Sequence, residues 1–294
     1  MSSHSRRVLL TGASGFIGRH CFEILKQNSY EVCACGYKNT EGMYSCNLLD
    51  VQNVQRLLQT FRPTYILHLA WCAGEGYAYD KKNIQWLDAG IELIRNFYAY
   101  GGERFVGVGT CFEYLLNGSR CFENSTPTRP NTLYGNAKLA LGMYLKTFAK
   151  GKGLSWAWCR PFYILGPGDP VHKIIPSAVL AFSKGKNFET AAYHRALDYL
   201  DVRDVASALV KILTADFCGY INVSSGKAVV VSDILDKLAG FFSSDVHGKQ
   251  NGEVCSTPCI VGDTTILRNI IKFEQKHDLE ETIRWYATMG KYNY

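Results

Sequence analysis

The sequence predicts an α/β fold in which a doubly wound parallel sheet carries a smaller C-terminal lobe. Apolar runs of strand length alternate with segments of helical periodicity over the first two thirds of the chain, as parallel strands joined by crossover helices require. The apolar runs are continuous, which is typical of strands covered by helices on both faces. A glycine-rich turn directly behind the first apolar run is the third observation that favours this fold.

The individual elements follow from these patterns in chain order. We expect strands at residues 8–10, 31–36, 65–70, 104–108 and 154–159, and helices at residues 17–27, 51–61, 83–100 and 132–150. Asp50 is expected to cap the second helix, which stops before Pro63. The segment 166–170 is dense in glycine and proline and marks the exit from the sheet.

The pattern loosens beyond this exit. Residues 174–183 have a helix-like pattern, and Asp204 is expected to cap a further segment at residues 205–213, which follows residues 199–202. The resulting division is a Rossmann-type domain at residues 1–165 and a lobe at residues 166–294. About residues 197–214 return to the first domain, and residues 220–223 and 232–242 belong to the lobe.

Composition and charge exclude several classes of protein. The chain has 294 residues, a net charge of +6 and no long basic cluster, so a nucleic-acid partner is unsupported. An apolar signal segment and a run of 18 apolar residues are both missing, so we expect no membrane partner and a cytoplasmic location. Several of the eleven cysteines lie in strand-like apolar runs, and none completes a zinc pattern. We therefore expect reduced cysteines and no metal.

The most informative motif is the glycine triplet Gly12, Gly15 and Gly18, which lies between the first strand and the first helix. Without Cβ atoms, such a turn lets a pyrophosphate rest on backbone N–H groups at the positive end of the helix dipole. The strand before it and the helix after it supply the context that this motif needs. The turn predicts dinucleotide binding.

A second motif, Tyr134 and Lys138, is expected in the first turns of a helix, where a spacing of four places both side chains on one face. An ammonium group one turn away stabilises a phenolate, so we expect Lys138 to lower the pKa of Tyr134 toward a value useful for proton transfer. Thr110 follows the strand at residues 104–108 and can offer a hydroxyl to a substrate carbonyl oxygen.

Together these motifs resemble the extended short-chain dehydrogenase/reductase family, the NAD(P)-dependent nucleotide-sugar epimerases, dehydratases and reductases. Further matching segments extend over nearly the whole chain: His68-Leu69-Ala70, Asn83, Arg160-Pro161, Gly166-Pro167, Val202-Arg203-Asp204-Val205 and Tyr220-Ile221-Asn222-Val223. The resemblance implies a catalytic trio of Thr110, Tyr134 and Lys138, with Lys138 also holding the nicotinamide ribose. It further implies a cofactor site made of Gly12, Ser14, Gly15, Phe16, Ile17, Gly18, Arg19, Gly36, Tyr37, Lys38, Asn47, Leu48, Leu69, Ala70, Trp71 and Pro161.

The choice of cofactor rests on the end of the second strand. NAD binders of the family carry an acid there to hold the ribose 2′-OH, whereas this chain has Gly36, Tyr37 and Lys38. An uncharged site followed by Lys38, together with Arg19, suits a 2′-phosphate, so NADPH is favoured over NAD. The other interpretation is that both cations are ordinary surface charges.

Two departures from the family pattern limit which of the family's reactions we expect. Cys111 and Phe112 supply no acid–base pair after Thr110, which disfavours dehydration, and Tyr163 stands where many members have Asn. The sequence of these motifs resembles that of CDP-abequose and paratose synthases. This resemblance implies NADPH-dependent reduction of the C4 keto group of a nucleoside-diphosphate 4-keto-6-deoxy sugar. The alternatives are an NAD-dependent 4-epimerase and a non-catalytic dinucleotide-binding sensor or scaffold.

Four residues are candidates for binding the substrate, and each has another interpretation. Glu113 could bind a sugar hydroxyl or be a buried structural carboxylate. Arg195 and Arg203 could bind the diphosphate or form structural ion pairs. Tyr163 replaces an Asn that touches the sugar or the nicotinamide in many members of the family, so its own contact with the substrate is not assigned. The resemblance also implies a homodimer that pairs through the helices at residues 83–100 and 132–150. The apolar positions on these helices could form that contact or pack on the protein's own sheet: Ile91, Ile94, Leu139, Met143 and Leu145.

Overall fold

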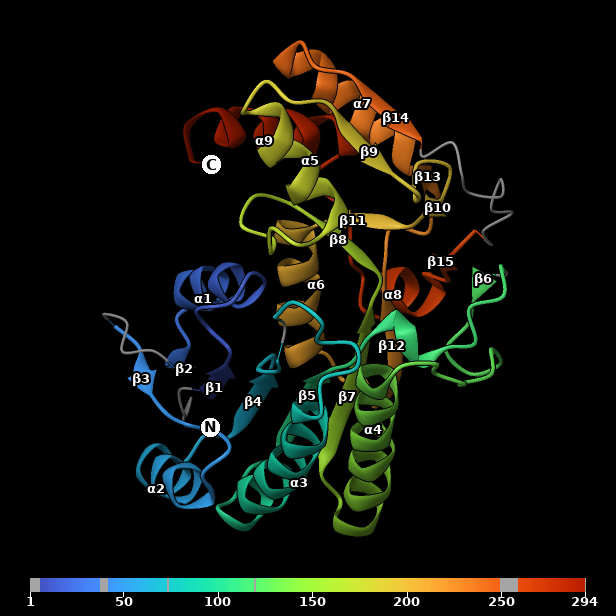
Figure 1. Cartoon of the computed structure of the whole chain (residues 1–294). Coiled ribbons are helices and arrows are strands. Elements are labelled where there is room, and N and C mark those ends of the chain that lie inside the picture. The colour runs from blue at the N-terminus through green and yellow to red at the C-terminus, as the bar shows by residue number, and fades with distance from the viewer. Residues whose placement is uncertain (1–5, 38–41, 73, 119, 249–258, 294) are drawn as a thin grey trace.

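The central sheet has seven parallel strands in the order β12-β7-β5-β4-β1-β2-β3 (Figure 1). The computed structural model describes residues 6–37, 42–72, 74–118, 120–248 and 259–293. The strands are β1 (Arg7–Thr11), β2 (Glu31–Gly36), β3 (Tyr44–Ser45), β4 (Tyr65–His68), β5 (Arg104–Val108), β7 (Ser155–Pro161) and β12 (Gly219–Val223). The predicted doubly wound parallel sheet is confirmed.

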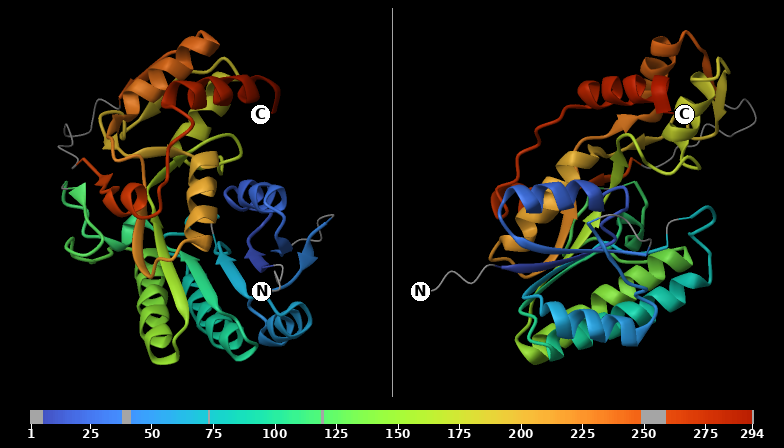
Figure 2. Two further views of the ribbon diagram at one scale, coloured as in Figure 1. Left: turned by 180° about the vertical axis from the view of Figure 1, so that it is seen from behind. Right: turned by 90° about the vertical axis from the view of Figure 1, so that its left-hand side faces the viewer.

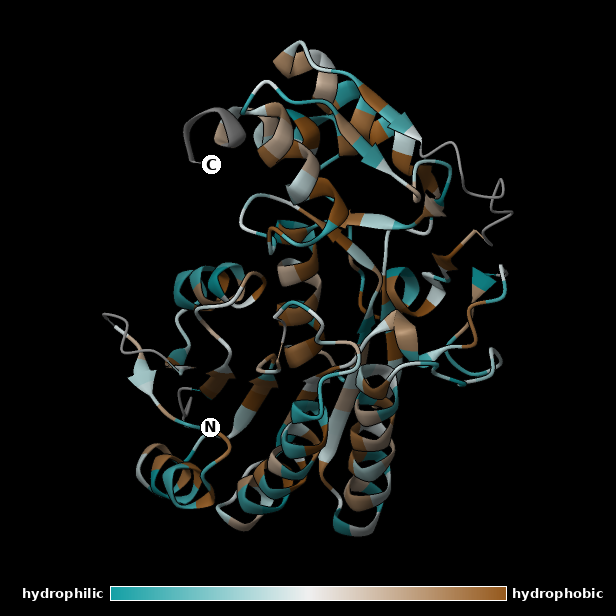
Figure 3. Ribbon diagram, in the orientation of Figure 1, coloured by the Kyte–Doolittle hydropathy of each residue, from teal (hydrophilic) through white to brown (hydrophobic). Residues whose placement is uncertain are grey.

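Helices cover both faces of this sheet (Figure 2). On one face lie α1 (Gly18–Gln27) and α6 (Val202–Thr214); on the other lie α2 (Val51–Phe61), α3 (Lys82–Ala99) and α4 (Leu133–Lys152). Successive residues of β1 pack into different cores, since Val8 and Leu10 face the α1–α6 side and Leu9 faces the other. This double burial explains why strands such as β1 are continuous apolar runs, and β1 is coloured hydrophobic in Figure 3.

The C-terminal lobe has its own apolar core between α5 (Ile174–Phe182), α7 (Val231–Phe242) and α9 (Leu279–Asn293). Short strands pair two by two around it: β8 (Tyr163–Leu165) with β11 (Tyr199–Asp201), β9 (Phe188–Thr190) with β14 (Val246–Gly248), and β10 (Ala196–Leu197) with β13 (Val229–Val230). The remaining elements are β6 (Arg120–Cys121), which pairs with β15 (Val261–Gly262), the 3-10 turn η1 (Cys111–Glu113) and α8 (Thr265–Asn269).

Two local expectations differ from the structure. Residues 220–223, which we expected in the lobe, form the edge strand β12 of the central sheet, where Ile221 pairs with Cys159 of β7. The helix expected to start behind Asp204 begins at Val202, because the carboxylate of Asp201 accepts the N–H of Arg203. Asp204 instead accepts the N–H groups of Lys276 and His277, and so ties α6 to the segment before α9. The predicted cap at Asp50 is confirmed, since its carboxylate accepts the backbone N–H groups of Gln52 and Asn53.

Within the described residues, no helix is long and apolar enough to cross a membrane. The described cysteines are all free thiols, and no three His, Cys, Asp or Glu side chains of the described ranges gather as a metal site would require.

Candidate active site

The glycine-rich turn joins β1 to α1 at the carboxyl edge of the sheet. Gly12 has a φ of +72°, and a Cβ there would lie 2.8 Å from the backbone nitrogen of Ala70. A Cβ on Gly18 would collide with the carbonyl of Gly12, so the turn closes only without these side chains. The backbone is thereby left bare where the N-terminus of α1 begins, which is the cradle that a dinucleotide pyrophosphate requires. The residues present therefore fit such a cofactor.

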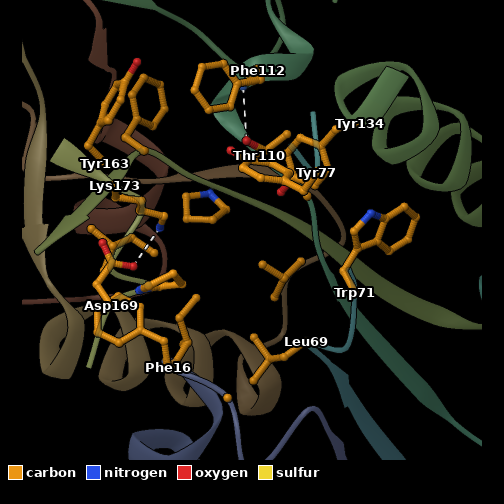
Figure 4. A pocket seen from close by; sticks show the side chains of 18 of the residues that line it. Phe16, Leu69, Trp71, Tyr77, Thr110, Phe112, Tyr134, Tyr163, Asp169 and Lys173 are labelled. Carbon is orange, nitrogen blue, oxygen red and sulfur yellow. Dashed lines mark hydrogen bonds and ion pairs between the residues drawn. The ribbon is translucent and has the colours of Figure 1, made fainter. Parts of the chain in front are cut away.

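A cavity of about 470 Å³ opens between this turn and the C-terminal lobe. It brings together fourteen of the predicted site residues: Gly12, Gly15, Phe16, Ile17, Gly18, Leu69, Ala70, Trp71, Thr110, Tyr134, Lys138, Pro161, Tyr163 and Arg195. Figure 4 shows Thr110, Tyr134 and Tyr77 gathered together, with Phe16, Asp169 and Lys173 across the pocket from Trp71.

The predicted catalytic trio comes from the ends of two elements. Thr110 follows β5 and caps η1, where its hydroxyl accepts the N–H of Phe112 at 3.3 Å. Tyr134 and Lys138 lie in the first turns of α4, which begins behind the cap Thr132 because that hydroxyl accepts the N–H of Gly135. The backbone N–H of Tyr134 donates to the carbonyl of Ala78 at 3.0 Å, which fixes the start of α4 against the loop before α3.

Lys138 is almost fully buried, and its ammonium lies closer to the ring of Trp71 than to that of Tyr134. Its Nζ donates to the carbonyl of Val108 at 2.7 Å and lies 4.0 Å from the ring centroid of Trp71, against 6.0 Å from that of Tyr134. Burial lowers the pKa of Lys138 to about 7, although the carboxylate of Glu113 opposes this shift.

The pKa of Tyr134 is raised, not lowered as the sequence analysis expected. Burial is the largest cause, the neighbouring phenol of Tyr77 adds to it, and hydrogen bonding with Thr110 opposes it. The ring of Tyr77 contacts that of Tyr134 edge-on, with centroids 4.9 Å apart. The expectation was wrong because the largest influence on the phenol is its burial, which disfavours the phenolate. Tyr134 is protonated at neutral pH.

Trp71 is fixed by Asn83 in the first turn of α3, which also ties down the loop before that helix. Its indole N–H donates to Oδ1 of Asn83 at 2.8 Å, and the amide of buried Asn83 donates to the carbonyls of Tyr77 and Asp80. Trp71 was predicted as a cofactor-lining residue, but its contact with Lys138 was not foreseen. That contact depends on side-chain direction, which the spacing of the motif does not reveal.

Glu113 is a structural carboxylate that does not line the cavity. It is completely buried, and its two oxygens accept the Thr110 N–H at 3.0 Å, the Trp158 indole N–H at 2.9 Å and the Arg160 Nε–H at 2.7 Å. Arg160 also donates to the hydroxyl of Tyr114. Of the two interpretations left open for Glu113, the structure favours the buried ion pair, which lies behind Thr110.

The two candidate arginines have different surroundings. Arg203 forms an ion pair with Asp201 at 2.7 Å and lies over the ring of Trp285, so it stabilises the lobe and does not reach the cavity. Arg195 lines the cavity, and its buried Nε has no hydrogen-bond partner among the described residues. The same holds for the hydroxyl of Tyr163. These two polar groups are available to a bound molecule.

The residues predicted around the adenosine lie outside this cavity. Tyr37 is 77% exposed beside Gly36 at the end of β2. Asn47 is exposed and Leu48 buried; the side chain of Asn47 accepts the N–H of Leu49, as a turn residue does. Ser14 is exposed on the glycine-rich turn. Lys38 lies outside the described residues. Arg19 does not line the cavity; its guanidinium donates to the carbonyl of Pro167.

Sequence reasoning missed several residues that line the cavity. These are chiefly Tyr77 and Phe112, and in the lobe Asp169, His172, Lys173 and Tyr199. Tyr77 lies in a loop with no periodicity, so the sequence offered no signal for it. The turn-rich segment at residues 166–170 was noted as the exit from the sheet, but its return to the glycine-rich turn depends on tertiary structure.

The model of the NAD dependent epimerase/dehydratase family matches residues 8–223. The chain belongs to this family. Its fold is that of the extended short-chain dehydrogenases/reductases, as the sequence analysis expected. The matched span includes every residue that lines the cavity, from Gly12 to Tyr199.

The proteins to which this chain is similar differ in how much of the chain they match. GDP-6-deoxy-D-talose 4-dehydrogenase of Aggregatibacter actinomycetemcomitans is 24% identical over 90% of this chain and 91% of its own length. Methionine adenosyltransferase 2 subunit beta of Xenopus laevis is 32% identical, but over 46% of this chain, and the match spans 41% of that relative. Among the solved structures, UDP-glucose 4-epimerase of Thermus thermophilus, in complex with NAD, has a TM-score of 0.83 at 24% identity and covers 98% of this chain and 100% of its own. RMD of Pseudomonas aeruginosa, complexed with NADPH, has a TM-score of 0.84 at 20% identity and covers 98% of each chain.

Proposed function

We propose that this protein reduces the C4 keto group of a nucleoside-diphosphate 4-keto-6-deoxy sugar with NADPH. The observation that carries the proposal is the gathering of Thr110, Tyr134 and Lys138 around one cavity with the glycine-rich turn. Two relatives that match over most of the chain support the substrate class, since their names give 4-dehydrogenation of GDP-6-deoxy-D-talose and of dTDP-6-deoxy-L-talose. A 4-dehydrogenase and a 4-ketoreductase catalyse the same reaction in opposite directions.

The roles of the chain's residues follow from their protonation and position. When bound, the nicotinamide supplies the hydride. The Tyr134 phenol donates a proton to the C4 oxygen of the sugar, and the Thr110 hydroxyl donates a hydrogen bond to the same oxygen. Reduction needs a protonated phenol at the start, and burial beside Tyr77 keeps Tyr134 in that form. Lys138 holds the nicotinamide ribose.

The sugar would occupy the part of the cavity that the lobe contributes. The ring of Phe112 from η1 and the rings of Tyr163 and Tyr199 from the lobe form a row there, with neighbouring centroids 5.9 and 5.6 Å apart. The apolar faces of these rings suit the deoxygenated carbon of a deoxy sugar. The free Nε of Arg195 and the hydroxyl of Tyr163 would meet the diphosphate and a sugar hydroxyl.

NADPH is preferred in this proposal because the end of β2 carries no acid. Gly36 and Tyr37 stand where an acidic residue would hold the 2′-OH of NAD. Arg19 does not support the assignment, since it is engaged with Pro167. The cationic partner proposed for the 2′-phosphate is Lys38, whose position the structure does not describe.

The experiment that tests the function combines purified protein, NADPH and a panel of CDP-, dTDP- and GDP-linked 4-keto-6-deoxy sugars. Loss of absorbance of the reduced cofactor with formation of a 4-hydroxy sugar is the expected result. A 4-epimerase is the second candidate, favoured by the structural likeness to UDP-glucose 4-epimerase. It would retain NAD through purification and convert UDP-sugars without net cofactor consumption, and this outcome would contradict the proposal.

A non-catalytic subunit is the third candidate, favoured by the half-length match to methionine adenosyltransferase 2 subunit beta. Such a protein would bind a dinucleotide without turnover of any sugar in the panel. The complete trio of Thr110, Tyr134 and Lys138 around one cavity supports an enzyme over this alternative.

A further inference from the structure

The connection between β8 and α5, at residues 166–173, crosses from the C-terminal lobe to the glycine-rich turn. The guanidinium of Arg19, one residue beyond Gly18, donates to the carbonyl oxygen of Pro167. Gly168 has a φ of +89°, and a Cβ there would collide with the same guanidinium. The connection is therefore held against the N-terminal end of α1, where the turn presents its backbone N–H groups.

This connection ends in Lys173, whose ammonium lies beside the turn. The Nζ of Lys173 is 5.9 Å from the ring centroid of Phe16, a residue of the turn, and the Arg19 guanidinium carbon is 5.8 Å from that centroid. Lys173 donates to Oδ1 of Asp169 at 2.7 Å, as the dashed line in Figure 4 shows. Phe16, Asp169 and Lys173 all line the cavity.

The other cations of the cavity are placed elsewhere. Among the described residues, Lys138, Lys173 and Arg195 are the lysines and arginines that line it. Lys138 donates to the carbonyl of Val108 and lies over the ring of Trp71. Arg195 belongs to the lobe and directly precedes β10. Lys173 is thus the cation that faces the turn. An ammonium has three N–H donors, so after bonding Asp169 it can still donate to an anion.

We propose that Lys173 binds the pyrophosphate of the dinucleotide from the lobe side, facing the backbone N–H groups of the turn. The inference rests on the proposed function in one respect, that the turn binds NADPH or NAD. The consequence is a binding site built from both parts of the chain, since α1 and the connection before α5 contact the same pyrophosphate. Neither the glycine motif nor the family pattern assigns this role to residue 173.

The test measures ligand binding by titration calorimetry without any sugar nucleotide. Lys173→Ala should weaken NADPH, NADH and ADP-ribose alike, each by about tenfold, as loss of one partly exposed charged contact implies. Adenosine, which has no phosphate, should bind Lys173→Ala and wild type equally. Lys173→Arg should retain most of the affinity. The matched control is Lys184→Ala. Lys184 is an exposed lysine just after α5, the helix that Lys173 precedes, and it does not line the cavity.

Unchanged affinity of Lys173→Ala for ADP-ribose would overturn the inference. So would a loss confined to free nucleoside diphosphates such as UDP and GDP, because that would assign Lys173 to the sugar-nucleotide substrate. A wild type that binds no dinucleotide overturns the inference and the proposed function together. A wild type that binds NADPH but reduces no sugar contradicts the proposed function alone, and the Lys173 comparison then still decides the inference.

Discussion

The buried ion pair between Glu113 and Arg160 should be a main determinant of stability around Thr110. Both side chains are 2% exposed or less, and the Nε–Oε2 distance is 2.7 Å. In Glu113→Gln, the amide oxygen can still accept the N–H groups of Thr110 and Trp158, but the amide nitrogen then faces Arg160, which is also a donor. The substitution therefore leaves the guanidinium charge buried without its carboxylate.

The expected cost is large because the charge cannot reach water. Removing one partner of a buried ion pair typically destabilises a protein by about 3–5 kcal/mol. For a chain of this size, that loss corresponds to a fall in Tm of about 6–20 °C. Thermal and urea unfolding of Glu113→Gln measure it directly. Glu280→Gln removes an exposed partner of Lys237 and should leave Tm unchanged, which makes it the matched control.

A double variant distinguishes the loss of stability caused by an unpaired buried charge from the loss caused by poorer packing. Glu113→Gln combined with Arg160→Met removes both charges, so it should be more stable than the sum of the two single losses predicts. Additive losses, or a Glu113→Gln protein that melts with the wild type, would refute the reasoning.

Four other outcomes are expected. Tyr134→Phe should lower turnover by roughly 10²–10⁴ with cofactor affinity within a few-fold, and steady-state rates above about a tenth of wild type would contradict a proton-donor role. Because the pKa of Lys138 falls from 10.5 to about 7 on folding, the unfolded chain binds one more proton between these values, so the stability of wild type relative to Lys138→Met should rise with pH across that window by up to about 1.4 kcal/mol per pH unit; urea titrations of both proteins measure this difference, from which the shared thiols and phenols cancel, and a difference that does not change with pH would contradict the shift. Gly36→Asp should weaken NADPH and strengthen NADH in direct binding measurements, and equal effects on both would count against the NADP assignment. Light scattering should give a dimer mass for wild type and a monomer mass for Met143→Lys, since Met143 is 57% exposed on α4; a monomeric wild type would dispose of the dimer.

The predicted site residues that the structure brings to one cavity depend mainly on local backbone geometry. The glycine triplet and the i, i+4 spacing of Tyr134 and Lys138 are satisfied within one turn or one helix, so spacing alone places them. The charged residues were harder to assign, because their partners are distant in the chain. Arg19 bonds Pro167, and Arg160 bonds Glu113 from another strand. The apolar positions proposed for the dimer show the same limit, since Ile94 and Leu145 are buried in the protein's own core.

Under the proposed function, one wall of the cavity carries the reacting groups and the other wall contacts the sugar nucleotide. The sheet domain contributes Thr110, Tyr134 and Lys138, whereas the lobe contributes Arg195 and Tyr199. The chain leaves the sheet after β7 and returns through α6 and β12, so the lobe wall is inserted between two strands of the same sheet. The elements beyond residue 223, chiefly α7 and α9, pack into the core of the lobe and do not line the cavity. If the protein acts on a sugar nucleotide as proposed, substitutions of Arg195 or of the aromatic row should change which sugar is accepted more than the type of reaction, because they leave Thr110, Tyr134 and Lys138 in place.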